Sequence, residues 1–183
     1  MPNITPTYAS LSGILGQQFT LGIGTPVVSN GSADCLEVSR QANVSTGGAV
    51  SVSESAGGSG VWVPYIPDRA TYGFTVGGSG WMGTGPFSGC HIAFFTKGGR
   101  VGMAHIAKPS SSAETAWDTF RTAGGVMVLN EWKVPLPDMT RNSASYMFLN
   151  LSDPTSVGLT QVDVHVRGMG GSDGAIFAVK KLV

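Results

Sequence analysis

Apolar and polar residues alternate along several short stretches of this chain, and such alternation indicates β-strands. The clearest stretches are residues 50–53, 126–132, 144–151 and 158–166. In the last of them, Val162 and Val164 fall on one face, whereas Asp163 and His165 fall on the other. Because successive side chains of a strand point to opposite faces, we expect the valines to face the core and Asp163 and His165 to face solvent.

One segment instead has the spacing of a helix. Its apolar residues recur at intervals of three or four positions: Ala113, Ala116, Trp117 and Phe120. Ser111 is the expected N-cap, Glu114 completes a capping box, and Gly124 is expected to end the helix. The apolar stripe predicts that this helix packs on a sheet.

These elements predict an α+β fold class. We expect a β-rich single domain over residues 1–183, with mixed, sandwich-like β-sheets and the one clear helix packed on a sheet. We expect residues 1–18 to form a loose N-terminal arm or a short helix. Residues 77–86 are rich in glycine, and we expect them to form a loop. The 27 glycines and the charged fraction of 12% agree with a fold that has many turns.

Residues 87–106 predict a β-hairpin, because two apolar runs flank Gly98-Gly99, a pair that suits a two-residue turn. A tight turn there places Thr96 opposite Val101 and Ile92 opposite His105. Cys90 is two residues before Ile92, so it shares a face with Ile92 and with His105. The sequence therefore predicts that a thiol and an imidazole are diagonal neighbours on one sheet face.

A cysteine beside a histidine is the arrangement that a thiol nucleophile and its general base require. Gly89, directly before Cys90, leaves the backbone open to a close substrate. The simpler interpretation is that Cys90 is an inert buried thiol, and a one-residue bulge in either strand would place the pair on opposite faces. A disulfide between Cys35 and Cys90 would also occupy the nucleophile, but a domain of this size does not need one.

The stretch Phe87-Ser88-Gly89-Cys90, with His105 downstream, resembles the Leu-Ser-Gly-Cys plus His signature of the glutamine deamidases. That family includes the catalytic domain of cytotoxic necrotizing factor, the Burkholderia lethal factor and the chemoreceptor deamidases, and the resemblance is greatest to the lethal factor. Phe87 replaces the leucine of the signature. Thr84 matches the position of the residue that orients the catalytic histidine in the lethal factor.

The resemblance implies a protein-glutamine deamidase of the toxin or effector type, in which Cys90 is the nucleophile, His105 the base and Thr84 the residue that positions His105. Ser88 and Gly89 are expected at the substrate and oxyanion site, where backbone N–H groups near Gly89 stabilise the oxyanion. Trp81 is expected to contact the substrate chain. By resemblance, the target is a host protein such as a translation-initiation helicase or a Rho-type GTPase.

Two kinds of alternative are also compatible with these residues: another cysteine enzyme, or a module without catalytic activity. A cysteine peptidase or a transglutaminase would need the same Cys90–His105 pair, and the resemblance alone selects a glutamine side chain over a peptide bond. A non-catalytic β-rich binding module would need Cys90 only as a buried core residue. The reactivity of the thiol and the change in mass of a target protein separate these functions.

Composition narrows the partners of the protein. The chain has 11 basic and 11 acidic residues and a formal net charge of zero, so we expect no nucleic-acid or membrane partner. The histidines and cysteines show no close ligand spacing, so we expect no metal and no other cofactor. Residues 1–6 lack the pattern of an ordinary secretory signal, and we expect a monomer that is secreted or injected into a host cytosol by another route.

Overall fold

A computed structural model describes residues 2–27, 34–77, 79–135, 142–152, 158–167 and 173–183. Strands account for 54% of these residues, and the only two helices among them are short. The helices are α1 (Tyr8–Ser12) and α2 (Ser111–Arg121). The protein is therefore mainly β, and the expected α+β class with sandwich-like sheets is wrong.

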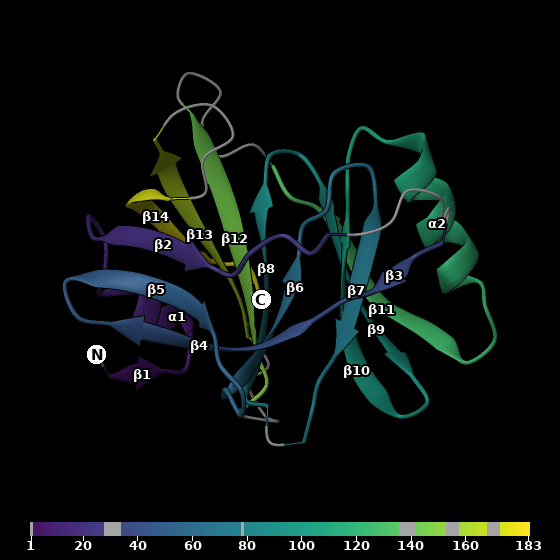
Figure 1. The fold of residues 1–183 in the computed structure, drawn as a ribbon, viewed down its shortest axis with the longest axis horizontal. Helices are drawn as coiled ribbons and strands as arrows, with labels where there is room; N and C mark the ends of the chain where they lie inside the picture. Colours follow the sequence, from purple (N-terminus) through teal and green to yellow (C-terminus); the bar gives the residue numbers. More distant parts are fainter. Residues whose placement is uncertain (1, 28–33, 78, 136–141, 153–157, 168–172) are drawn as a thin grey trace.

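The larger sheet closes on itself into an eight-stranded barrel (Figure 1). In chain order its strands are β2 (Gln18–Gly22), β4 (Arg40–Thr46), β5 (Ala49–Glu54), β6 (Gly60–Pro64), β8 (Trp81–Phe87), β12 (Ser143–Asn150), β13 (Gly158–Val166) and β14 (Gly174–Lys181). Around the barrel the order is β4-β5-β2-β14-β13-β12-β8-β6, and pairing of β4 with β6 closes the ring. A further strand, β1 (Asn3–Ile4), pairs with β4.

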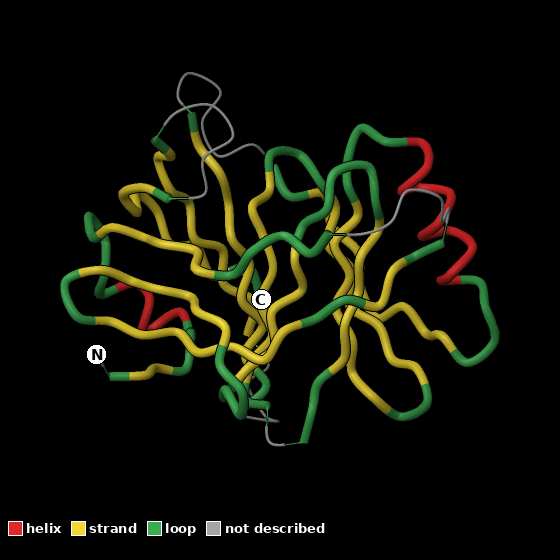
Figure 2. The backbone as a smooth tube through the Cα atoms, viewed as in Figure 1, coloured by secondary structure: helices red, strands yellow, loops and turns green. Residues whose placement is uncertain are grey.

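A second sheet has five strands and lies beside the barrel (Figure 1). Its strands are β3 (Leu36–Glu37), β7 (Ala70–Phe74), β9 (His91–Lys97), β10 (Arg100–Ile106) and β11 (Val126–Lys133), in the spatial order β11-β9-β10-β7-β3. Helix α2 covers the face of this sheet that is turned away from the barrel (Figure 2). The prediction that this helix packs on a sheet is confirmed.

Three buried clusters follow from this arrangement. Trp62, Trp81 and Phe148 belong to the cluster inside the barrel. A second cluster joins the outer face of the barrel to the near face of the second sheet, and a third joins the far face to α2. Because the second sheet is covered on both sides, residues 92–95 of β9 and residues 102–106 of β10 are all buried, whichever way they point.

The predicted hairpin is confirmed in register. Thr96 pairs with Val101 and Ile92 pairs with His105, without a bulge between β9 and β10. Gly98 and Gly99 adopt φ values of 58° and 76°, the left-handed conformation that a two-residue turn of this kind requires.

The prediction of a loop over residues 77–86 is wrong from Trp81 onward, because β8 begins there and continues through the glycines. Aromatic packing explains the glycines: a Cβ added at Gly83 would lie 2.8 Å from a ring atom of Trp62. Residues 2–18 contain the short helix α1, the second of the two expected alternatives, and not a loose arm, since β1 pairs with the barrel and Leu11 of α1 is fully buried.

Two smaller expectations also change. Val162 and Val164 face the barrel core as predicted, but Asp163 is fully buried rather than exposed. Its Oδ1 accepts hydrogen bonds from Ser145 and Gln161, and its Oδ2 lies 2.6 Å from Lys180 Nζ. Helix α2 is capped by Ser110 rather than Ser111, and Thr122 rather than Gly124 is its C-cap.

Candidate active site

The candidate site lies where the outer face of the barrel meets the second sheet. Strand β10 carries His105 on the face turned toward the barrel, and β8 presents Thr84 to it. Thr84 Oγ1 and His105 Nδ1 share a hydrogen bond of 2.9 Å. Both side chains are almost entirely buried, with Thr84 at 0% and His105 at 1% exposure. The fold therefore brings together a threonine and a histidine from two different sheets.

The environment of His105 favours a neutral imidazole. The Phe87 ring stacks on the imidazole with parallel planes and a centroid distance of 4.0 Å. Burial lowers the pKa of His105 to about 3, because the charged form loses its hydration. Nε2 has no hydrogen-bond partner among the described residues. When Nδ1 donates to Thr84, Nε2 keeps the lone pair that a general base needs.

Cys90 directly precedes β9 and is turned toward the same interface. It belongs to the same buried cluster as Ile92 and Met103, whereas Ala93 and Ala104, which directly follow Ile92 and Met103, pack on the α2 side. The predicted common face of Cys90 and His105 is therefore confirmed. No hydrogen bond joins the sulfur to Nε2 in this structure, and both Cys90 and Cys35 are free thiols.

The thiol of Cys90 is protonated at rest. Burial raises its pKa, and hydrogen bonds from the backbones of Lys108 and Ser88 act in the opposite direction. Cys90 is 3% exposed. Because burial also keeps His105 neutral, the resting pair is a thiol and an imidazole rather than a thiolate–imidazolium ion pair.

Tyr65 is a site residue that sequence reasoning missed. Its ring lies 5.1 Å from the imidazole of His105, between centroids. Burial raises the pKa of the Tyr65 phenol, and the negative charges of Asp68 and of Cys90, the latter only when its thiol is ionised, raise it further. Nothing in the run around Tyr65 distinguishes it from an ordinary strand residue, so only the folded structure could reveal its position beside the pair.

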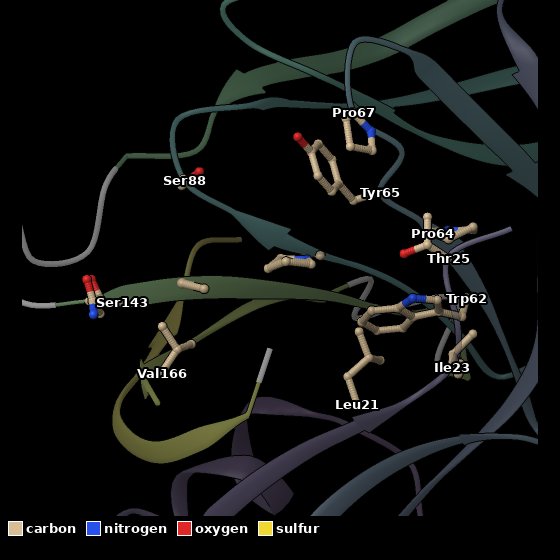
Figure 3. Close-up of a pocket in the computed structure, with 14 residues that line it drawn as sticks. Leu21, Ile23, Thr25, Trp62, Pro64, Tyr65, Pro67, Ser88, Ser143 and Val166 are labelled. Atoms are coloured by element: carbon tan, nitrogen blue, oxygen red, sulfur yellow. The ribbon is translucent and has the colours of Figure 1, made fainter. Parts of the chain in front are cut away.

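Tyr65 also lines a pocket of about 540 Å³ at one end of the barrel (Figure 3). Ser88 lines the same pocket from the connection between β8 and β9, and Ser143 and Val166 line it from the barrel. A second pocket, of about 730 Å³, is lined by Ser88 and Gly89. Ser88, two residues before Cys90, thus lines both pockets.

Gly89 has the conformation and the space expected of a substrate-approach position. Its φ of 107° is in the region that favours glycine, and an added Cβ would meet no atom within 4 Å. Trp81 is placed elsewhere: it is fully buried inside the barrel, and its Nε1 donates to Ser59 Oγ at 3.2 Å. The expectation that Trp81 contacts the substrate is corrected, because the barrel encloses its side chain.

The described residues hold no group of three or more His, Cys, Asp or Glu side chains placed to bind a metal ion. Neither described helix is long and apolar enough to cross a membrane.

No protein-family model, curated protein or solved structure gave a significant match to this chain. The candidate function of this protein therefore rests on the chemistry of Cys90, His105 and Thr84.

Proposed function

We propose that this protein is a protein-glutamine deamidase, with Cys90 as the nucleophile, His105 as the general base and acid, and Thr84 as a positioning residue. The observation that carries the proposal is the 2.9 Å hydrogen bond between Thr84 Oγ1 and His105 Nδ1. It orients a neutral imidazole on the sheet face that also carries Cys90, and it leaves Nε2 without a partner among the described side chains.

The reaction starts from the neutral pair. Nε2 of His105 takes the thiol proton as the sulfur of Cys90 attacks the carboxamide carbon of a glutamine side chain. The C–N bond then breaks, and the imidazolium gives its proton to the departing nitrogen, which leaves as ammonia. Water hydrolyses the resulting thioester with the help of His105, and this step releases glutamate and regenerates the thiol.

The burial of the pair has a consequence for catalysis. A pKa of about 3 makes imidazolium unfavourable in the free protein, so proton transfer from Cys90 requires a change in the surroundings of His105. The backbone groups of Lys108 and Ser88, which act to lower the pKa of Cys90, stabilise the thiolate as it forms. Substrate binding at Gly89 and Tyr65 supplies the remaining polar contacts in this proposal.

Selection of a glutamine side chain, rather than a peptide bond, rests on the resemblance of residues 87–90, His105 and Thr84 to the deamidase signature. The conversion adds one negative charge to the target protein, and such a charge inside an interface acts as a lasting switch. A toxin or effector acting on a host translation-initiation helicase or a Rho-type GTPase fits this chemistry.

The test is mass spectrometry of a eukaryotic cell lysate incubated with the purified protein. We expect one or a few glutamines to gain the mass of an amide-to-acid conversion, with ammonia released in step. Cys90→Ser and Cys90→Ala should abolish the conversion and keep the wild-type circular dichroism spectrum. Cys35→Ser, which removes the other thiol, is the matched control and should retain full activity.

Other outcomes overturn the proposal. Cleaved chains would identify a peptidase, and crosslinked chains would identify a transglutaminase. An unmodified lysate, or a conversion that persists in both Cys90 variants, would remove the deamidase function altogether.

A further inference from the structure

The pocket of about 730 Å³ beside Gly89 has charged lining residues that take no part in the reaction described above. It lies at the end of the second sheet next to α2, and His91, Lys108, Glu114 and Lys133 line it together with Ser88 and Gly89. His91 follows Cys90 and pairs with Lys133 across β9 and β11. A substrate peptide that passes over Gly89 to reach Cys90 therefore lies directly beside this pocket.

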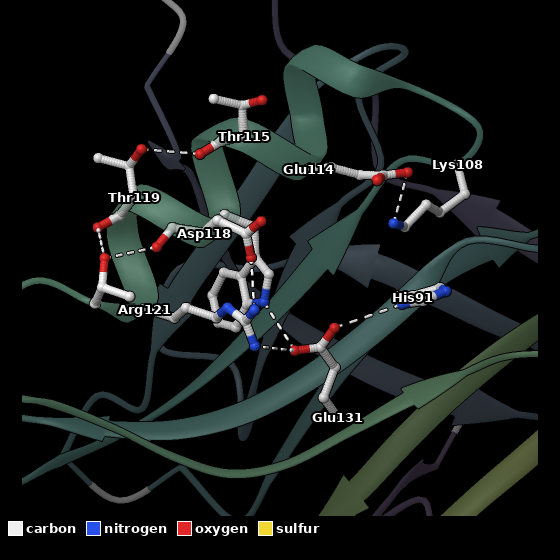
Figure 4. Close-up of polar contacts among 10 residues, drawn as sticks. His91, Lys108, Glu114, Thr115, Asp118, Thr119, Arg121 and Glu131 are labelled. Atoms are coloured by element: carbon white, nitrogen blue, oxygen red, sulfur yellow. Dashed lines mark hydrogen bonds and ion pairs between the residues drawn. The ribbon is translucent and has the colours of Figure 1, made fainter.

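Most charged groups around the pocket already have partners (Figure 4). Lys108 Nζ lies 2.6 Å from Glu114 Oε1, so these two charges neutralise each other. His91 Nδ1 lies 3.5 Å from Glu131 Oε1, and the other oxygen of Glu131 accepts a hydrogen bond of 2.9 Å from Trp117 Nε1. These contacts leave neither carboxylate free to neutralise another cation.

Lys133 differs from its neighbours. Its side chain is exposed, and it has no ion-pair partner among the residues that the structure describes. The two lysines of the pocket lining outnumber its single glutamate, and the surplus positive charge is that of Lys133. An anionic group entering the pocket meets this charge without displacing an existing partner.

We propose that this pocket binds the carboxylate of an aspartate or glutamate that lies close to the target glutamine in the substrate. The inference rests on the proposed function and names its substrate class: glutamines in acidic protein segments. Gly89 provides the crossing point, because nothing lies within 4 Å of the position of an added Cβ there. The glutamine then reaches Cys90 while its acidic neighbour contacts Lys133.

The test uses short synthetic peptides that each contain one glutamine and differ only in whether the flanking positions carry glutamate, alanine or lysine. Binding is measured by fluorescence polarisation with the inactive Cys90→Ala protein, and kcat/KM for ammonia release is measured with the active protein. We expect the glutamate peptides to bind and react about fivefold better than the alanine peptides, an effect typical of an exposed ion pair.

Lys133→Glu should reverse this order, so that the lysine peptides become the best. The matched control is Lys181→Glu, which makes the same change in charge at an exposed lysine on β14 that does not line this pocket. Lys181→Glu should keep the preference for glutamate. Added salt should reduce the preference of the wild-type protein, because the pair is exposed.

The results separate the two proposals. Deamidation of all peptides at equal rates would overturn the specificity for acidic segments, and so would the same peptide preference in Lys133→Glu and Lys181→Glu. Neither result would contradict the proposed deamidase activity. Charge-ranked binding without any ammonia release would support the anion-binding pocket and count against the reaction.

Discussion

The inside of the barrel and the interface between barrel and second sheet are both buried, but they are built differently. The barrel interior is filled largely by rings and aliphatic side chains, among them Trp62, Trp81 and Phe148. The interface has an apolar cluster too, yet it also encloses His105 and Thr84. The interface, unlike the hydrophobic core of the barrel, therefore holds the polar groups on which the proposed reaction depends.

The difference shows where the fold accepts an energetic cost. A buried imidazole must lose its hydration, and one hydrogen bond to Thr84 compensates only one of its two nitrogens. A core designed for stability alone would place an apolar residue at position 105. The unpartnered Nε2 is the kind of local exception that is expected at a functional site.

The largest effect on stability should come from the barrel interior. Trp62→Ala removes a fully buried ring and should lower the free energy of unfolding by about 3–5 kcal/mol. Urea denaturation followed by circular dichroism measures the change. Leu129→Ala, at a position that is 54% exposed, should cost about 0.5 kcal/mol or less. Equal losses in the two variants would contradict the view that the barrel interior is the main stabilising core.

A smaller effect, with a different signature, is expected at the interface. Thr84→Val keeps the shape of the side chain but leaves Nδ1 of His105 without its hydrogen bond. We expect kcat to fall about tenfold to a hundredfold, the equivalent of an unpaired buried polar group, while KM changes little.

Thr84→Ser shows whether the loss of the hydroxyl group causes the fall in kcat of Thr84→Val. Serine restores the oxygen without the methyl group, so it should recover most of kcat. A serine variant as slow as the valine variant would assign Thr84 a packing role instead.

The smallest predicted effect is on the pH dependence of stability. Because the pKa of His105 is about 3 in the folded protein and about 6.5 when unfolded, acid favours the unfolded state over this range. The His105 contribution is fully present above pH 6.5 and is lost as the pH falls toward 3. Between pH 6.5 and 5.5, the wild-type protein should lose about 1 kcal/mol more than His105→Gln, measured by urea denaturation at each pH. Parallel curves for the two proteins would contradict the buried, neutral imidazole.

Local rules were enough to predict the hairpin and the arrangement of several residues of the candidate site. The turn at Gly98-Gly99 determines the pairing of Ile92 with His105, and the alternation of side chains then places Cys90 on the face of His105. The signature residues pointed to Thr84, whose hydrogen bond to His105 is present in the structure. These features depend on short stretches whose geometry the backbone itself restricts.

Burial and fold class depended instead on contacts between distant segments. Glycine-rich residues before Cys90 indicated a loop by composition, but the rings of Trp62 and Tyr146 fill the space above Gly83 and Gly85 and make this segment strand β8. Asp163 alternates as a solvent-facing residue would, yet its neighbours in the sheet enclose it.

The sequence by itself thus determined the local geometry: the turn, the register of β9 with β10, and the common face of the thiol and the imidazole. Only the tertiary structure decided that a closed barrel forms, that its outer face is covered by the second sheet, and that Tyr65 lies beside His105. The physical reason is that alternation tells which side chains share a face, whereas what covers that face depends on contacts between residues far apart in the chain.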